Sequence, residues 1–321
     1  MVEETFVYAK LMLFGEYSLL FGSRALTLPF LEKKAALRST DPLMAPQVLK
    51  NAENSNRQLA SFHRFLILHK DKEEGWGGLD LDAMHKDLRD GLYLWSDIPS
   101  GYGLGSSGAL VAAIYRRYGP GPVPGSPAEI SPGRLSFLKG LLGRMEAFFH
   151  GSSSGIDPLS CYLGAPLTID PAAGPSLVRL KKPATKENQS FFLVDTGKAR
   201  HTAPLVRSFQ RRYCQPDFRR MLHESYIPCT EKCIEAMTSA STTPGPHIRE
   251  LSLLQLRHFT PMIPPEFIRI WERGLGTGSY SLKLCGAGGG GYLLGHTTHA
   301  GLLPPGIQSA IAVDLSPFTG C

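Results

Sequence analysis

The sequence predicts an α+β protein of two domains, on three observations. Its 321 residues are more than one hydrophobic core usually organises, so two domains are expected. Strand patterns occur near both ends of the chain, at residues 5–14 and at residues 280–295, where a run of glycines interrupts the second pattern. Between them, several segments predict helices, as at residues 56–69, where Leu59, Phe62 and Leu66 recur at helical spacing.

The individual elements follow from the same patterns. Residues 5–14 are β-branched and apolar and end at Gly15, and residues 25–29 predict a second, short strand. Apolar residues three to four positions apart predict the helices. These are expected at residues 56–69, 79–94, 134–149, 248–259 and 265–273.

A polar segment around residue 185, KKPATKENQS, separates two apolar runs and is expected to mark the domain boundary. The predicted domains are therefore residues 1–185 and 186–321. Residues 119–133 hold many prolines and glycines and predict a loop between helices rather than a domain of their own.

Composition narrows the class of protein. With 34 basic against 28 acidic residues, the net charge is +6, which suits an anionic small molecule and is too weak to indicate nucleic-acid binding. No apolar run approaches the ~20 residues that span a bilayer, and the N-terminus lacks a signal-peptide pattern. The six cysteines show no zinc-site spacing, so we expect a cytoplasmic protein with reduced thiols.

Residues 100–108, SGYGLGSSG, predict a phosphate-binding turn. Their glycines let several backbone amides point toward one place, and a helix starting near Ser106 adds the positive end of its dipole. The Gly-Lys-Ser/Thr ending of a Walker A loop is missing. The loop alone also allows a tight turn with serine caps.

Two carboxylates lie on either side of the turn HGSSSG, namely Glu146 and Asp157. Glu146 is expected in the last turn of a helix, where the macrodipole disfavours a negative charge and a bound cation would offset it. Beside a phosphate loop, one carboxylate suits Mg²⁺ and the other suits acceptance of a hydroxyl proton. Capping of the next helix by Asp157 is the structural alternative, and His150 is expected to be structural.

Residues 283–292, KLCGAGGGGY, place four consecutive glycines between two strands. Such a run predicts close backbone approach to a ligand or to another loop. Lys10 lies inside the first strand, where it could neutralise a phosphate or extend to the surface.

Taken together and in this order, KLMLFGEYSLLFG, IPSGYGLGSSGAL and KLCGAGGGG resemble the three motifs of the GHMP kinase superfamily, across residues 8–295. The resemblance implies a ribosomal-protein-S5-like N-terminal domain and a ferredoxin-like α/β sandwich at the C-terminus. Within the superfamily, the spacing of Glu146 and Asp157 is most similar to the mevalonate kinase pattern E…HGxxSGxD. It implies Mg²⁺-dependent transfer of the ATP γ-phosphoryl to the 5-hydroxyl of (R)-mevalonate, in isoprenoid precursor synthesis.

The resemblance also implies roles for individual residues. Asp157 would be the general base, Lys10 would bridge the acceptor oxygen and the γ-phosphate, and Ser107 and Glu146 would bind Mg²⁺. ATP contacts are expected from Gly101, Gly103, Leu104, Gly105, Ser106, Ser107 and Gly108. Acceptor contacts are expected from Lys10, Glu16, Tyr17, Asp157, Arg200, Thr202, Gly286, Ala287 and Gly288.

Two departures leave alternatives open. Tyr17 stands where mevalonate kinases usually have histidine, and phosphomevalonate kinases often have tyrosine there. Gly108 replaces the usual alanine. Phosphomevalonate kinase or another GHMP small-molecule kinase is therefore the first alternative, and basic residues for a phosphorylated acceptor could come from Arg207, Arg211 and Arg212, which otherwise form a solvated helix face.

The alternative from a different functional class is a pseudokinase, a protein that binds nucleotide but does not catalyse its turnover. Retention of Lys10, Ser107, Glu146 and Asp157 argues against it, because a pseudokinase typically loses the base or the metal ligand first. The expected partners are ATP and a small-molecule acceptor, with neither nucleic acid nor membrane. A homodimer is left open.

Overall fold

The computed structural model describes residues 5–70, 76–121, 130–181, 190–200, 202–239, 243–297, 307 and 310–319. The chain forms two compact units. Unit one comprises the chain up to Lys10, Pro29–Pro99 and Leu104–Ala165, and unit two comprises Leu11–Leu28, Ser100–Gly103 and the chain from Pro166 onward. The predicted domain boundary near residue 185 lies outside the described residues.

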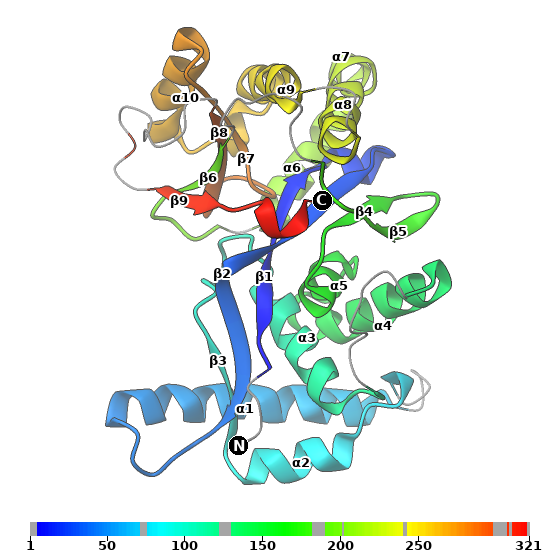
Figure 1. Ribbon diagram of the computed structural model, residues 1–321, viewed down its shortest axis with the longest axis vertical. Coiled ribbons are helices and arrows are strands. Elements are labelled where there is room, and N and C mark those ends of the chain that lie inside the picture. The colour runs from blue at the N-terminus through cyan, green and yellow to red at the C-terminus, as the bar shows by residue number, and fades with distance from the viewer. Residues whose placement is uncertain are drawn as a thin grey trace. The chain divides into compact units, whose positions relative to one another are not determined.

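Unit one is built mainly from helices. Its elements are α1 (Pro46–Leu68), α2 (Leu81–Arg89), β3 (Leu92–Ser96), α3 (Ser106–Tyr118), α4 (Pro132–His150) and α5 (Ile156–Leu163), with parts of β1 (Val7–Phe14) and β2 (Ala25–Ser39). β3 pairs antiparallel with the end of β2. α1 packs on β3, while α3, α4 and α5 pack against one another (Figure 1). The side chains of Leu59, Phe62 and Leu66 on α1 are buried, which confirms the apolar face that their spacing predicts.

Two sequence predictions in this unit are wrong. The helix expected over 79–94 ends at Arg89, and β3 follows it, because Gly91 adopts a left-handed φ of 84° that stops the helix. The second strand continues from Ala25 to Ser39 instead of ending at residue 29. Its pairing with β3 over five positions, Ala35 to Ser39, supplies tertiary support that local propensity does not reveal.

Unit two holds a four-stranded antiparallel sheet and the remaining helices. The strands of this sheet are β6 (Ser190–Asp195), β7 (Tyr280–Leu284), β8 (Tyr292–Thr297) and β9 (Ala310–Val313), while β4 (Leu167–Asp170) and β5 (Gly174–Leu177) belong to the sheet of β1 and β2. The helices are α6 (Thr202–Tyr213), α7 (Pro216–Met221), α8 (Ile227–Thr238), α9 (Pro244–His258) and α10 (Pro265–Thr277). Single turns complete it, namely η1 (Ser18–Phe21), η4 (Leu222–Tyr226), η5 (Thr260–Met262) and η6 (Ser316–Phe318).

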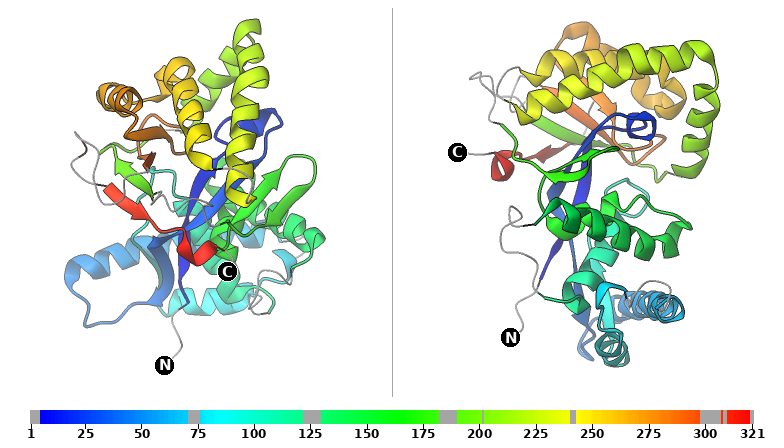
Figure 2. Two further views of the ribbon diagram at one scale, coloured as in Figure 1. Left: turned by 45° about the horizontal axis from the view of Figure 1, so that its top comes forward. Right: turned by 90° about the vertical axis from the view of Figure 1, so that its right-hand side faces the viewer.

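The sheet of unit two has the strand order β7-β8-β6-β9, and every neighbouring pair is antiparallel. With β8 and β6 at the centre, this is the order of a ferredoxin-like sheet. α9 and α10 pack on β7, and α8 packs on α9 (Figure 2). β4 pairs with the start of β2 and with β5. The predicted α+β class and the ferredoxin-like sheet are confirmed.

Among the described residues, no helix is both long enough and apolar enough to cross a membrane.

Candidate active site

The glycine-rich loop leads directly into α3, as predicted. Gly105 precedes the helix with φ at 73° and, as a glycine, provides no capping side chain. The first amides of this 13-residue helix have no acceptor within the helix, and the helix dipole is positive there. This is the arrangement that binds phosphate groups.

Lys10 and Asp157 form an ion pair beside that loop. The Lys10 ammonium, 5% exposed, lies 2.8 Å from Oδ1 of Asp157, whose side chain is 33% exposed. The backbone N–H of Lys10 donates to the carbonyl of Leu104 at 2.9 Å, and a Cβ on Gly105 would touch both members of the pair. The ion pair and the start of α3 are thus neighbours within unit one.

Asp157 lies in the first turn of α5, and Gly155 with φ at 73° occupies the capping position. The side chain of Asp157 does not cap the helix, so the structural role considered for it does not hold. Its carboxylate points instead to Lys10 and keeps one third of its surface accessible.

Glu146 lies on α4, four residues before the helix ends, and its side chain is buried. Its Oε1 accepts a hydrogen bond from Ser107 at 2.7 Å and its Oε2 accepts one from Ser153 at 2.5 Å. His150 Nε2 also lies 3.0 Å from the Ser107 hydroxyl. Burial raises the pKa of Glu146, and the negative charge of Asp157 raises it further.

These residues fit a divalent cation that arrives with phosphates. Lys10 is the ammonium partner of Asp157, whereas within the described part of the chain no ion pair involves Glu146. The described residues contain no cluster of three or more His, Cys, Asp or Glu side chains that could hold a metal by themselves. Mg²⁺ is usually held by one or two carboxylates together with substrate phosphates, and a cation would relieve the repulsion between the two carboxylates.

In unit two, Arg200 lies between two glycines. Its guanidinium donates to the carbonyl of Cys285, and its backbone N–H donates to the carbonyl of Gly101 at 3.0 Å. A Cβ on either Gly103 or Gly286 would collide with the guanidinium. Both glycines also adopt left-handed φ angles, 79° and 74°, which residues with a side chain rarely take.

Tyr17 and Glu16 are buried in unit two. Tyr17 adopts a left-handed φ of 62°, donates its hydroxyl to the carbonyl of Ala287 at 2.6 Å and stacks on Phe209 with ring centroids 4.2 Å apart. Burial raises the pKa of the Tyr17 hydroxyl well above its usual range. The Glu16 side chain is 1% exposed, so it offers almost no surface to a ligand.

The remaining predicted residues differ in accessibility. Thr202 is exposed at the start of α6, and its neighbour at position 201 lies outside the described residues. Gly288 packs against η5, where the amide of Gly289 donates to the carbonyl of Met262 at 2.6 Å. Gly108 packs against α5, where a Cβ would lie 2.7 Å from the backbone nitrogen of Pro158.

Two residues that lie in these clusters had no role predicted from the sequence. Ser153 holds Glu146, and its place in a serine-rich turn gave no specific signal. Lys283 pairs with Glu16, with 2.5 Å between Nζ and Oε1. A lysine inside the apolar strand YSLKL was the available signal, because a charge in a strand that is buried throughout requires a partner.

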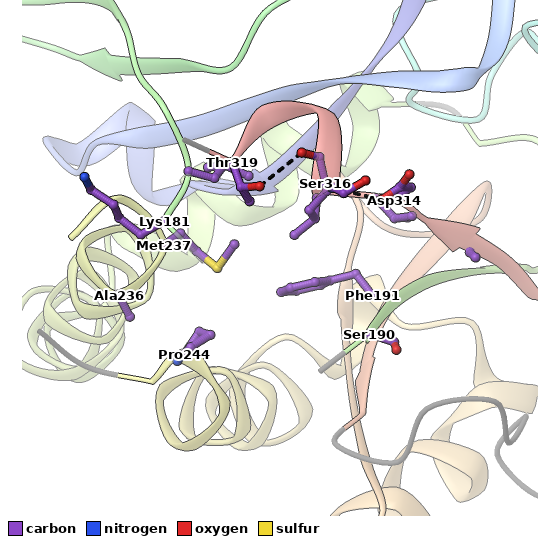
Figure 3. A pocket seen from close by; sticks show the side chains of 13 residues that line it. Lys181, Ser190, Phe191, Ala236, Met237, Pro244, Asp314, Ser316 and Thr319 are labelled. Carbon is purple, nitrogen blue, oxygen red and sulfur yellow. Dashed lines mark hydrogen bonds between the residues drawn. The ribbon is translucent and has the colours of Figure 1, made fainter. Parts of the chain in front are cut away.

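A separate hollow of about 500 Å³ lies in unit two between the end of α8, the start of α9 and strands β6 and β9 (Figure 3). Phe191 and Met237 project into it, and Ser316 and Asp314 lie at its edge. None of the residues predicted from sequence to bind ATP or the acceptor lines it.

No protein-family model and no curated protein matches the chain, but solved structures match almost its whole length. An L. major mevalonate kinase in complex with R-mevalonate superposes with a TM-score of 0.59 and 16% identity, over 97% of this chain and 95% of that one. A Streptococcus pneumoniae phosphomevalonate kinase in complex with phosphomevalonate and AMPPNP gives 0.61 and 16%, over 94% and 93%. A Lactococcus lactis galactokinase complexed with galactose gives 0.57 and 13%, over 93% and 86%.

The chain has the GHMP kinase fold. The three neighbours act on different acceptors according to their names, yet they cover similar shares of the chain with similar TM-scores. The likeness therefore confirms the fold that the motifs predict and does not discriminate between acceptors. In this chain the GHMP kinase fold carries a lysine–aspartate pair and a serine–glutamate pair beside the start of α3.

Proposed function

We propose that the chain is an ATP-dependent small-molecule kinase of the GHMP superfamily. The observation that carries the proposal is the contact of the Lys10–Asp157 pair with the loop that opens α3. A base, an ammonium and a phosphate-binding helix start are the parts that phosphoryl transfer to an alcohol requires.

In the proposed reaction the acceptor hydroxyl oxygen attacks the γ-phosphorus, and the bond from that phosphorus to the β,γ-bridging oxygen breaks. Asp157 accepts the hydroxyl proton through its accessible carboxylate. Lys10 neutralises the charge that develops on the acceptor oxygen and the phosphoryl group. The products are the phosphate ester and ADP.

The amides at the start of α3 are proposed to hold the phosphates, with Gly101, Gly103, Leu104, Gly105 and Ser106 shaping the loop. Ser107 and Glu146 are proposed to hold Mg²⁺, because their oxygens already share a hydrogen bond. When bound, Mg²⁺ supplies positive charge to the phosphate oxygens. Close packing of Gly108 on α5 supports a role in seating the helix rather than in touching ATP.

For the acceptor we propose (R)-mevalonate, phosphorylated on its 5-hydroxyl. Arg200 would bind its carboxylate, since a guanidinium matches that planar anion, and the exposed Thr202 would contact a hydroxyl. We further propose residues 1–185 and 186–321 as the functional domains of a cytoplasmic enzyme.

Phosphomevalonate is the second candidate acceptor, and Tyr17 is the observation that favours it. The Tyr17 hydroxyl donates to the carbonyl of Ala287 and is thus engaged within the protein. It therefore does not take over the role of the histidine that mevalonate kinases usually carry at this position. Arg200 would still meet a carboxylate, because both acceptors carry one.

Release of ADP from Mg·ATP should be measured with mevalonate, phosphomevalonate, galactose and homoserine in parallel. We expect turnover with mevalonate alone. Turnover with phosphomevalonate alone would support the kinase assignment and make phosphomevalonate, rather than mevalonate, the acceptor. Silence with all four, while ATP still binds, would contradict the assignment and favour a nucleotide-binding role.

A further inference from the structure

Lys283 is the one charged residue in β7, a strand that is buried throughout. All five residues of β7 are buried, and the Lys283 side chain is 1% exposed. Its ammonium donates to Oε1 of Glu16 at 2.5 Å and to the carbonyl of Leu284 at 2.6 Å. Removing an ammonium from water costs several kcal/mol, so these two bonds must offset a substantial penalty.

Glu16 is equally buried, and only one of its oxygens is used. Oε1 faces Lys283 and lies 3.5 Å from the backbone nitrogen of Gly286. Oε2 has no hydrogen-bond partner in the described part of the chain. Burial raises the pKa of Glu16, and the charge of Lys283 opposes that shift.

Stability is a poor explanation for such a pair. A buried ion pair is often no more stabilising than apolar side chains of the same volume, and an unsatisfied oxygen adds to its cost. The pair instead fixes the local geometry. The Lys283 ammonium and the Glu16 carboxylate keep their hydrogen bond only while the two side chains stay in this arrangement.

The segment that this geometry fixes is the start of the third glycine-rich motif, Leu284–Ala287. Lys283 binds the carbonyl of Leu284, and the amide of Leu284 donates to Gln255 at 2.8 Å. The carbonyl of Cys285 accepts from Arg200, and that of Ala287 accepts from Tyr17. Side chains from several distant parts of the sequence therefore hold consecutive residues.

Arg200 depends on this segment for its position. Its guanidinium binds the carbonyl of Cys285 and rests against Gly286. A shift of either residue would displace the carbonyl that the guanidinium binds and the backbone that it contacts.

We propose that Glu16 and Lys283 are positioning residues, which hold Cys285 and Gly286 so that Arg200 presents its guanidinium to the anionic group of the acceptor. The inference rests on the proposed function, in which Arg200 binds that group. It also changes the role of Glu16, from the acceptor contact expected from sequence to a residue that acts through Arg200.

The test uses the full chain with Glu16→Gln and Lys283→Met combined, because Gln and Met keep the shapes and remove both charges. We expect this double variant to keep most of the wild-type unfolding midpoint. Its KM for the acceptor should rise about tenfold with little change in kcat or in the KM for Mg·ATP, since binding of the acceptor is what Arg200 supplies. A stable double variant with unchanged acceptor KM would overturn the proposal.

Coupling to Arg200 separates positioning from a general structural effect. If the pair acts through Arg200, adding Arg200→Met to the double variant should raise the acceptor KM no further than Arg200→Met alone. Additive effects would contradict the proposal. As a matched control, Arg24→Met with Glu231→Gln removes the 2.6 Å ion pair of unit two that lies elsewhere, and it should leave all kinetic constants unchanged.

Amide hydrogen exchange provides a readout that does not need activity. The amides of residues 284–287 and of Arg200 should lose protection in the double variant while the rest of β7 and β8 keeps it. Unchanged protection would overturn the positioning role. Absence of kinase activity in the wild type with every acceptor would instead reject the proposed function and leave this measurement decisive.

Discussion

Among the lysine–carboxylate pairs of the described residues, one in each unit invites comparison, because the two have similar lengths and very different surroundings. Lys10 and Asp157 in unit one meet at 2.8 Å with one third of the aspartate exposed, whereas Lys283 and Glu16 in unit two meet at 2.5 Å with both side chains 1% exposed. An exposed carboxylate can exchange a proton with a substrate, and a sealed one cannot. The same chemical pair therefore suits catalysis in one unit and geometry in the other.

The largest effect is expected from the exposed pair. Asp157→Asn should lower kcat by about 10²- to 10⁴-fold, because the amide cannot accept the hydroxyl proton. Binding of Mg·ATP, measured by titration calorimetry, should change little. Asp217→Asn is the control, since that carboxylate is 96% exposed on α7, and a similar kcat in both variants would reject Asp157 as the base.

Removal of each lysine should separate the two pairs by stability. Lys283→Met leaves the Glu16 carboxylate buried without a partner, so the free energy of unfolding should fall by about 3–5 kcal/mol. Lys10→Met should cost less, because water can reach Asp157. Urea denaturation of both variants measures the difference, and equal losses would contradict the contrast between a sealed and an open pair.

The contribution of Glu146 to the stability of the protein should depend on pH. Its pKa is raised from 4.5 by burial and by Asp157, so without nucleotide its contribution to stability is full below the unfolded-state pKa and is lost as pH rises through the folded-state pKa. Glu146→Gln does not titrate. Its unfolding midpoint, relative to wild type, should therefore increase with pH above about 4.5, as thermal scans across pH can measure.

The same substitution, which should increase relative stability at higher pH, should weaken the use of Mg²⁺. Glu146→Gln should raise the Mg²⁺ concentration needed for half-maximal turnover, because a carboxylate ligand is lost. A flat stability difference across pH would contradict the raised pKa of Glu146, and an unchanged Mg²⁺ requirement would argue against its cation-binding role.

The smallest effect is expected at Tyr17. Tyr17→Phe keeps the stacking on Phe209 and removes the hydrogen bond to Ala287, which should lower the free energy of unfolding by about 0.5–1.5 kcal/mol. The acceptor KM should rise slightly, since Ala287 belongs to the segment that positions Arg200. A rise as large as that of the Glu16 and Lys283 double variant would show that Tyr17 contacts the acceptor itself.

Local patterns in the sequence predicted what depends on local structure. The start of α3 at Ser106 follows from a glycine-rich loop before an apolar run, and the strand–glycine–strand of residues 280–295 follows from its periodicity. β3 was missed because its few residues were included in a helical window, although Gly91 and the sequence LYLW at Leu92–Trp95 already indicate an end and an alternation.

The candidate site likewise has residues that local motifs predict and residues that only the fold brings together. The motifs nominated Lys10, Asp157, Ser107 and Glu146, whose mutual contacts the structure then provides. The pairing of Glu16 with Lys283 joins residues 267 positions apart, so no local pattern could indicate it. Only the fold brings such residues together.

Gly108 gives the close approach of α3 and α5 a further meaning. A methyl group there would lie 2.7 Å from the nitrogen of Pro158 and 2.8 Å from the carbonyl carbon of Asp157, so the alanine usual in resembling sequences does not fit this spacing. A misplacement of about 1 Å can cost an enzyme about 10² in rate. Substitutions of increasing size at position 108 would therefore be expected to increase, step by step, the distance between the proposed phosphate loop and the proposed base, Asp157.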